Sequence, residues 1–125
     1  MGKRRALILE DDGIVASLEK AVLEGEGFEV EIAGDGAEGL KRIKKSAYDL
    51  IISDIVMPKM RGDEFYRAVK GLSRGLEKRI VFVSASIDDF IKSTGNRFVE
   101  KPFSSQLLVQ AVRDVFISDG NEAFT

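Results

Sequence analysis

The chain has 125 residues, of which 44% are hydrophobic and 32% are charged, and its net charge is −2. This length fits one compact domain with a real hydrophobic core. The balanced charge gives no electrostatic basis for direct binding of nucleic acid. The sequence contains no cysteine and no histidine, which excludes disulfides, thiolate or imidazole metal sites, and a phosphohistidine on this chain.

No apolar run approaches the roughly 20 residues that span a bilayer, and the N-terminus lacks the apolar core of a signal peptide. We therefore expect a cytoplasmic protein without membrane contact. One domain is expected over residues 1–117. Residues 118–125 show no periodic pattern and are expected to form a C-terminal tail or the start of a linker.

Short apolar runs alternate along the chain with segments whose apolar residues recur at helical spacing. Continuous runs of this kind are typical of parallel strands that are buried on both faces. Strands are expected at residues 6–9, 28–32, 50–52, 80–83 and 98–99. Helices are expected around residues 14–22, 37–43, 65–72, 87–92 and 107–116. Five strands that alternate with five helices predict an α/β protein with a parallel sheet and right-handed crossovers.

The first helix has recognisable ends. Asp12 can cap its N-terminus, and Gly27 is a suitable stop. The apolar residues that recur at helical spacing between them are Ile14, Val15, Leu18, Ala21 and Val22. The following run, residues 28–32, alternates between apolar and acidic side chains and indicates an edge strand.

Unusual polar residues follow four of the five expected strands. Glu10 and Asp11 follow the first, Asp54 the third, Ser84 ends the fourth, and Lys101 follows the fifth. The carboxyl ends of parallel strands lie on one edge of a sheet, where open α/β sheets bind their ligands. The sequence therefore predicts that three carboxylates, one hydroxyl and one ammonium meet at this edge.

Three carboxylates in one place repel each other unless a cation is bound or one of them is protonated. Oxygen ligands without histidine or cysteine suit a hard cation such as Mg²⁺. Mg²⁺ uses few carboxylates, which leaves Asp54 free to act as a nucleophile and form an aspartyl phosphate. Lys101 and Mg²⁺ would then neutralise the phosphoryl oxygens, and Ser84 would donate a hydrogen bond.

Four segments of the chain resemble response-regulator receiver domains of two-component phosphorelay systems. These segments are residues 7–12, residues 54–58 with Gly62, residues 83–85 and residues 101–103. The resemblance covers almost the whole chain. It implies a flavodoxin-like, doubly wound sheet of five strands in the order 2-1-3-4-5. It also implies a phosphoacceptor signalling domain that phosphorylates and dephosphorylates itself rather than turning over a substrate.

The same resemblance assigns roles to residues of this chain. Asp54 corresponds to the phosphorylation site, which takes its phosphoryl group from a histidine kinase or a histidine phosphotransfer domain. Asp11 corresponds to the direct Mg²⁺ ligand, Glu10 to its acidic partner, and the backbone carbonyl of Val56 to the third protein ligand beside Asp54. Mn²⁺ would be an alternative metal. A weak homodimer is compatible with the resemblance.

Two further residues correspond to the conformational switch. Ser84 matches the switch hydroxyl and Phe98 the switch aromatic, while Lys101 matches the lysine that contacts the phosphate. By the same resemblance we expect a cis peptide bond between Lys101 and Pro102, with the last helix beginning at Ser104. Phosphorylation of Asp54 would then change the conformation and control an output.

The sequence also departs from the family pattern. Arg61 stands where an acidic residue is common. The stretch from Ser84 to Lys101 is shorter than usual by about one helical turn, roughly 5 Å of rise, so helix 4 is expected to be short. We therefore expect a partner to contact helix 1 or helix 5 more than helix 4. Residues 93–96 resemble receivers attached to hybrid histidine kinases.

Three other functions compete with this interpretation. The main alternative is a pseudo-receiver that serves as a docking module without phosphotransfer. A phosphatase of the haloacid-dehalogenase type would need a second acid two residues after the nucleophile, where this chain has Val56. A flavodoxin-like carrier of FMN would need a phosphate-binding loop after the first strand, where the acids at residues 10–12 would repel phosphate.

Overall fold

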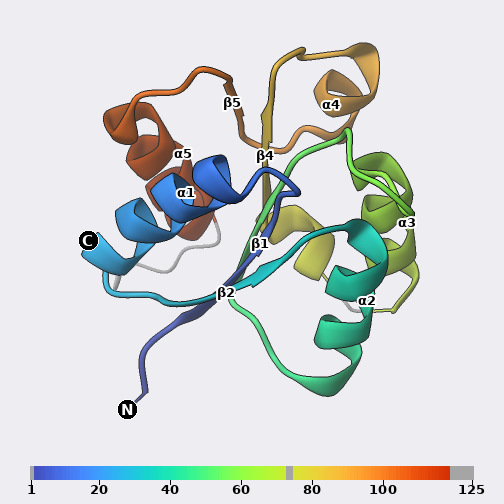
Figure 1. Ribbon diagram of the computed structural model, residues 1–125, viewed down its shortest axis with the longest axis horizontal. Coiled ribbons are helices and arrows are strands. Elements are labelled where there is room, and N and C mark those ends of the chain that lie inside the picture. Colours follow the sequence, from blue (N-terminus) through green and yellow to red (C-terminus); the bar gives the residue numbers. More distant parts are fainter. Residues whose placement is uncertain (1, 73–74, 119–125) are drawn as a thin grey trace.

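The computed structural model describes residues 2–72 and 75–118 (Figure 1). Five strands form one parallel sheet in the order β2-β1-β3-β4-β5. The strands are β1 (Arg5–Leu9), β2 (Glu29–Ala33), β3 (Leu50–Ser53), β4 (Ile80–Ser84) and β5 (Phe98–Glu100). The helices are α1 (Gly13–Gly25), α2 (Gly36–Lys45), α3 (Gly62–Leu72), α4 (Asp89–Thr94) and α5 (Ser105–Ser118). The predicted fold, strand order and short fourth helix are therefore confirmed.

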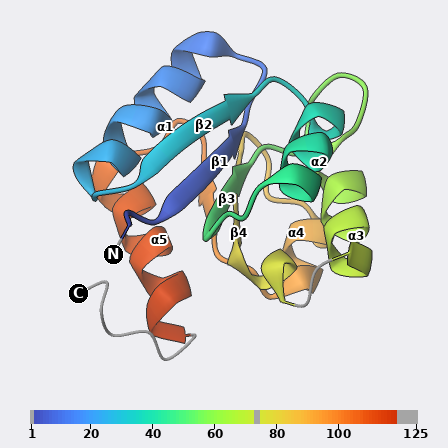
Figure 2. The ribbon, with the colours of Figure 1, turned by 90° about the horizontal axis from the view of Figure 1, so that it is seen from below.

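Helices cover both faces of the sheet, as Figures 1 and 2 show from two directions: α1 and α5 lie on one face, and α2, α3 and α4 lie on the other. Successive residues of β1 point to opposite faces. Ala6 and Ile8 belong to the apolar cluster under α1 and α5, whereas Leu7 and Leu9 belong to the cluster on the other face. Because both faces are buried, a continuous apolar run is the pattern that this strand requires.

Most of the apolar residues that predicted α1 lie outside its buried face, although Val22 packs partly buried against the core. Ile14 is 77% exposed and Leu18 is 57% exposed. The buried residues of α1 are Ala16, Glu19 and Leu23, which also follow one another at helical spacing. The helix therefore carries two stripes with a helical period, and the sheet covers the stripe that includes a glutamate.

Two local features differ from the sequence prediction. A 3₁₀ turn, η1 (Leu76–Arg79), precedes β4 and was not expected; Gly75 starts it with φ 88°. Gly75 was the only local sign, since glycine adopts positive φ without steric cost. The last helix begins at Ser105, one residue later than predicted. Ser104 caps it instead, because its Oγ accepts a hydrogen bond from the Leu107 amide at 3.1 Å.

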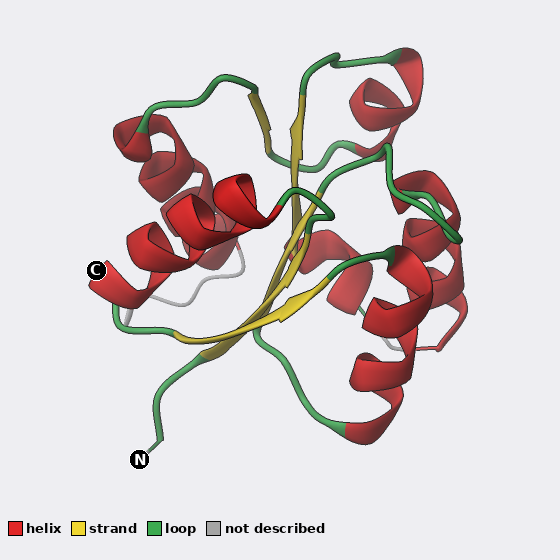
Figure 3. Cartoon of the chain, in the orientation of Figure 1, coloured by secondary structure: helices red, strands yellow, loops and turns green. Residues whose placement is uncertain are grey.

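The peptide bond between Lys101 and Pro102 is cis, which confirms that expectation. Figure 3 shows the helices, strands and loops of the same view, with α5 as the last described element. The expected tail from residue 119 onward lies outside the described residues, so the boundary after residue 117 stays a prediction. No helix in the described ranges has both the length and the apolar character of a membrane span.

Candidate functional site

Backbone hydrogen bonds hold the predicted site residues side by side at the carboxyl edge of the sheet. The Glu10 amide donates to Ala33, and the Asp54 amide donates to Leu9, each at 3.1 Å. On the other side, the Lys101 amide donates to the Ser84 carbonyl at 2.8 Å. The parallel ladder thus continues one residue or more beyond the strands. Its register brings Glu10 level with Asp54, and Lys101 follows slightly further along at the same edge.

Lys101 joins two of the three carboxylates. Its Nζ donates to Asp54 Oδ2 at 2.7 Å and also to Glu10 Oε1. The remaining carboxylate oxygens accept hydrogen bonds from backbone amides. The Asp12 amide donates to Glu10 Oε2 at 3.1 Å, and the Ile55 amide donates to Asp54 Oδ1 at 2.6 Å. Both carboxylates are nearly buried and held by two donors each, so their orientation is well defined before any ligand arrives.

The protonation of this group depends on burial as well as on pairing. Burial raises the pKa of Glu10, and the hydrogen bond from Lys101 only partly offsets this effect. Burial alone would lower the pKa of Lys101, but its hydrogen bonds to Asp54 and Glu10 outweigh burial and raise that pKa. Lys101 is therefore a stable cation at neutral pH.

The third carboxylate, Asp11, is exposed at the same place. One oxygen each from Glu10, Asp11 and Asp54 lies within 4.8 Å of the others. A single ammonium from Lys101 does not balance three carboxylates, so the cluster retains negative charge. Oxygen donors with excess negative charge fit a hard divalent cation such as Mg²⁺.

Gly62 brings the loop after β3 close to the backbone of Asp54. Its amide donates to the Ile55 carbonyl at 2.9 Å. A Cβ atom on Gly62 would lie 2.1 Å from the Asp54 carbonyl oxygen, a distance at which the backbone would have to move. A glycine is therefore needed here for the loop to fold back beside the site.

The other predicted site residues lie nearby but make no contact that tests their roles. Ser84 is buried at the end of β4, next to Lys101. Phe98 opens β5 opposite Phe82 and is 44% exposed, so it lies outside the core. Val56 lies on the loop after β3 with 66% of its surface exposed. The switch roles of Ser84 and Phe98 and the ligand role of Val56 stay predictions.

Sequence reasoning missed one residue beneath the site. Glu19 of α1 is 1% exposed, and its Oε1 atom has no hydrogen-bond partner among the described residues. The charges that act on it are those of Glu10, Lys101 and Asp54. Its place in the sequence, three residues after Ala16 and four before Leu23, was the available signal for a buried position.

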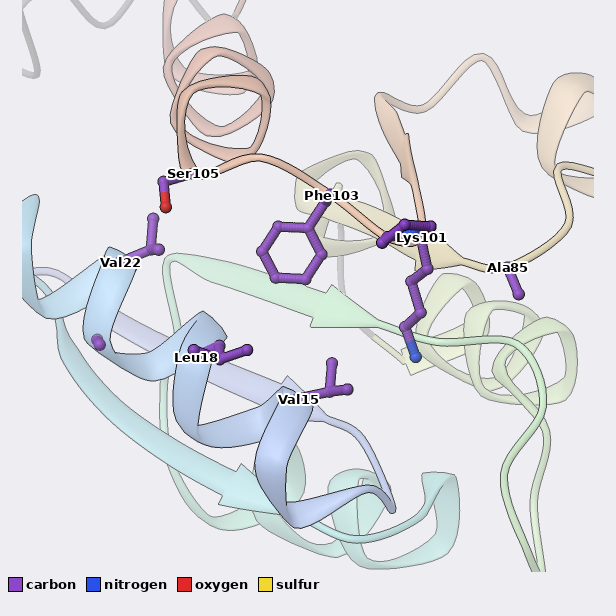
Figure 4. A pocket seen from close by; sticks show the side chains of 9 residues that line it. Val15, Leu18, Val22, Ala85, Lys101, Phe103 and Ser105 are labelled. Atoms are coloured by element: carbon purple, nitrogen blue, oxygen red, sulfur yellow. The ribbon is translucent and has the colours of Figure 1, made fainter.

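A groove of about 580 Å³ adjoins Lys101 on the side of α1. Figure 4 shows it between α1 and the segment that follows β5, with Phe103 facing Leu18 and Val22 across it. Lys101 lies at one end, and Ser105 at the other. Its lining is mainly apolar, and the groove leads to the charged group.

Comparison with known proteins identifies the family. Residues 6–113 match the family model of the response regulator receiver domain. The chain is 32% identical over 114 residues to the transcriptional regulatory protein DltR of Streptococcus agalactiae serotype III (strain NEM316), covering 87% of this chain and 50% of that protein. It is 32% identical over 116 residues to the DNA-binding response regulator MtrA of Mycolicibacterium smegmatis (strain ATCC 700084 / mc(2)155), covering 89% and 50%. The chain thus spans about half the length of these curated relatives.

Solved structures give the same result. The chemotaxis response regulator CheY4 of Vibrio cholerae superposes with a TM-score of 0.81 at 30% identity, covering 90% of this chain and 98% of that one. A CheY-like receiver domain protein from Methanospirillum hungatei JF-1 superposes with a TM-score of 0.85 at 28% identity, covering 96% and 98%. The receiver domain of a signal transduction histidine kinase from Syntrophus aciditrophicus superposes with a TM-score of 0.80 at 26% identity. The match covers 96% of this chain and 93% of that one.

The family match covers most of the chain, and the acidic cluster and the lysine lie at the edge where such a sheet binds its ligands. The chain therefore belongs to the response regulator receiver domains, the phosphoacceptor signalling domains of two-component systems.

Proposed function

We propose that Asp54 accepts a phosphoryl group from a phosphohistidine of a partner, with Mg²⁺ bound beside it. The observation that carries the proposal is the position of Asp54: its Oδ2 contacts Lys101 Nζ at 2.7 Å, and the acids of Glu10 and Asp11 lie within 4.8 Å. One carboxylate is thus held by an ammonium, beside oxygen ligands for a metal.

The site residues divide the tasks of this transfer among them. The Asp54 carboxylate attacks phosphorus, the bond between phosphorus and the histidine nitrogen breaks, and that nitrogen keeps the electron pair. The ammonium of Lys101, which contacts the carboxylate before the transfer, then stabilises the negative charge on the phosphoryl oxygens. Asp11, Glu10, Asp54 and the Val56 carbonyl are the proposed metal ligands. When bound, Mg²⁺ would supply positive charge for the phosphoryl oxygens.

Phosphorylation by a small phosphodonor tests this function. With acetyl phosphate and Mg²⁺, intact mass spectrometry should show one added phosphoryl group on the wild-type protein. Asp54→Asn should show none, because an amide is a poor nucleophile, whereas the exposed control Asp89→Asn should be labelled normally. An unlabelled wild-type protein would favour the alternative of a pseudo-receiver that only docks.

Metal binding is tested without phosphorylation. Mg²⁺ that relieves the repulsion at the carboxyl edge stabilises the folded state by mass action, so millimolar Mg²⁺ or Mn²⁺ should raise the melting temperature. Asp11→Asn should reduce that increase. Superimposed melting curves with and without metal, for both proteins, would contradict the proposed ligands.

The groove beside Lys101 is the proposed contact for the phosphohistidine partner. Leu18 is both exposed and part of this groove, and Ile14 is exposed one turn earlier on α1. A domain that docks there would bring its histidine toward Lys101 and Asp54. The six-residue α4, by contrast, offers little surface.

A charge introduced into the groove should weaken binding of the partner without affecting the phosphorylation reaction itself. Leu18→Lys should slow phosphotransfer from a phosphorylated histidine phosphotransfer domain but leave labelling by acetyl phosphate unchanged. Leu72→Lys, at an equally exposed leucine of α3, serves as the control. Equal transfer rates in both variants would exclude the groove as the docking surface.

The proposed readout uses Ser84 and Phe98. The Ser84 hydroxyl moves toward the phosphoryl oxygens, which accept strong charge-assisted hydrogen bonds, and the ring of Phe98 turns into the vacated space. Beryllofluoride, a mimic of the phosphoryl group, should change amide hydrogen exchange near Phe98, α1 and α5. Changes confined to residues 86–96 would contradict this route.

A further inference from the structure

The β3–α3 loop (residues 54–61) is attached to the start of α2. The amide of Gly36, the first residue of α2, donates a hydrogen bond to the Met60 carbonyl at 3.1 Å. Asp35 makes a second link: its carboxylate caps α2 by accepting from the Glu38 amide, and its Oδ2 lies 3.9 Å from Lys59 Nζ. Figures 1 and 2 show α2 beside α3, with this loop passing the start of α2. A helix that contributes no predicted site residue therefore holds the loop that follows Asp54.

The backbone of this loop adopts an uncommon conformation at its tip. Lys59 has φ 66°, in the left-handed region, and it is the one residue other than glycine with a positive φ in the part of the chain that the structure describes. The Met60 amide donates to the Pro58 carbonyl at 2.7 Å, so Lys59 is the centre of a γ-turn of the strained kind. Such a conformation persists only where its surroundings enforce it, commonly near a functional site. The contacts with α2 supply that enforcement here.

The fit between α2 and the loop leaves no room for a side chain on Gly36. A Cβ atom there would lie 2.6 Å from the Met60 carbonyl oxygen and 3.0 Å from Met60 Cβ and Cγ. Gly36 does not have a positive φ, so the close approach, rather than the backbone conformation, requires glycine. A larger residue would push the tip of the loop away from α2.

The base of the same loop reaches the Asp54 carboxylate. The Gly62 amide donates to the Ile55 carbonyl at 2.9 Å, which closes the loop below its tip. The Ile55 amide donates to Asp54 Oδ1 at 2.6 Å, and it is the donor that holds this oxygen. The orientation of the carboxylate therefore depends on where the loop lies.

We propose that Gly36 is a positioning residue for Asp54. By letting the loop lie against α2, it fixes the Ile55 amide and, through it, the carboxylate that binds the metal and accepts the phosphoryl group. This inference rests on the proposed phosphoacceptor function and adds a residue to it. Groups that orient a metal ligand from behind commonly change metal affinity by about 10- to 100-fold, so displacement of the loop should weaken Mg²⁺ binding about tenfold.

Three glycines of this region provide the variant and its matched controls. Gly36→Ala places a methyl group against the loop. Gly39→Ala, about one turn later on α2, places the same group against the buried side chain of Leu9, so it disturbs the packing of the helix without contacting the loop. Gly34→Ala adds a methyl group with no atom within 4 Å. A role of Gly36 in stability alone would make it behave like Gly39.

Nuclear magnetic resonance of metal-free protein tests the positioning directly. The Ile55 amide donates to a carboxylate, a strong kind of hydrogen bond, so its proton should resonate at low field. In Gly36→Ala this signal should move upfield because the loop and its amide are displaced, whereas Gly39→Ala and Gly34→Ala should keep it. An Ile55 signal that is unchanged in Gly36→Ala would overturn the proposal.

Titration with Mg²⁺ measures the consequence for the metal. The half-saturating concentration should rise about tenfold in Gly36→Ala and stay at the wild-type value in both controls. Labelling by acetyl phosphate should require correspondingly more Mg²⁺ in that variant. Equal Mg²⁺ affinity in Gly36→Ala and Gly39→Ala would assign Gly36 to stability alone and overturn its positioning role.

The wild-type protein gives a test that does not depend on any variant folding. During the Mg²⁺ titration, the Gly36 amide should shift with the same midpoint as the Ile55 amide, because the loop joins them. The Gly39 amide donates to the Asp35 carbonyl at 3.1 Å, as long a hydrogen bond as that of Gly36, and should shift less. A Gly36 amide that does not respond while Ile55 does would overturn the link.

These measurements separate the two proposals. If Gly36→Ala is labelled as fast as the wild type at every Mg²⁺ concentration, the role of Gly36 is wrong while Asp54 stays the phosphoacceptor. If the wild type neither binds Mg²⁺ nor becomes labelled, the phosphoacceptor function is wrong. The Ile55 signal of the metal-free variants would then still decide whether Gly36 positions Asp54.

Discussion

Glu19 and Glu31 carry the same side chain in opposite surroundings. Glu31, on the edge strand β2, accepts hydrogen bonds from Tyr48 at 2.7 Å, from Arg42 at 2.9 Å and from Arg5. These hydrogen bonds lower its pKa, with Tyr48 as the largest cause. The Oε1 atom of Glu19 has no donor among the described residues, and burial raises the pKa of its carboxyl to about 8. The difference shows that donors and water, rather than residue type, decide whether a carboxylate stabilises this fold.

The two residues should therefore change stability with pH in opposite directions. A raised folded pKa means that the folded state binds the proton more tightly than the unfolded chain, so stability falls as pH rises from the unfolded toward the folded pKa. A lowered folded pKa gives the reverse, and stability is lost as pH falls through that pKa. Glu19 thus favours folding in acid, whereas Glu31 favours folding near neutrality and above.

The largest expected effect is that of Glu19→Leu. The folded pKa of about 8 stands against 4.5 for a free carboxyl. Between these values the free energy of unfolding should fall by up to about 1.4 kcal/mol per pH unit in the wild type. The variant should be more stable by about 3 kcal/mol at neutral pH. Urea unfolding followed by circular dichroism at several pH values measures this gain, which must grow with pH; a gain independent of pH would refute the assignment. Glu24→Leu is the matched exposed control.

Glu31→Gln should have a smaller effect of the opposite sign. Its partners are about one-third exposed, so the ion pairs are largely solvated, and the loss at neutral pH should be below about 1 kcal/mol. The loss should vanish in acid, where the wild-type Glu31 is protonated too. If the variant were more stable than the wild type at neutral pH, the network on β2 would not be stabilising.

Added salt should also affect the two glutamates differently. Added salt screens exposed charges and affects buried ones much less. The cost of Glu31→Gln should therefore shrink in 1 M sodium chloride, where the Debye length is about 3 Å, while the gain of Glu19→Leu should persist. Unfolding curves of both variants at low and high salt give this comparison directly. An equal response of the two variants would mean that Glu19 is as hydrated as Glu31.

Tyr48→Phe should give the smallest change. It removes one neutral donor from Glu31 while both arginines remain, so the pKa of Glu31 should rise toward its ordinary value without reaching it. The carboxyl ¹³C titration of Glu31 detects this shift. Stability should change less than in Glu31→Gln, and the Glu19 titration should stay the same, which makes that residue an internal control.

Much of the candidate site was predictable from sequence because the carboxyl ends of parallel strands lie at one edge of the sheet. Glu10, Asp54 and Lys101 each follow a short apolar run, and the ladder brings them to one edge whatever the loops do. The short α4 followed in the same way from the length between Ser84 and Lys101. The turn η1 was missed because a single glycine, Gly75, is a weak local signal.

The sequence by itself determined the alternation of strands and helices, the residues at the carboxyl edge and the resemblance that names the family. Only the tertiary structure decided which face of α1 is buried, because two stripes of that helix have a helical period and only packing against the sheet chooses between them. That choice exposes Ile14 and Leu18 and buries Glu19. It also puts a carboxyl oxygen, Glu19 Oε1, where it has no hydrogen-bond partner within residues 2–72 and 75–118, since burial is a property of neighbours that the linear chain does not specify.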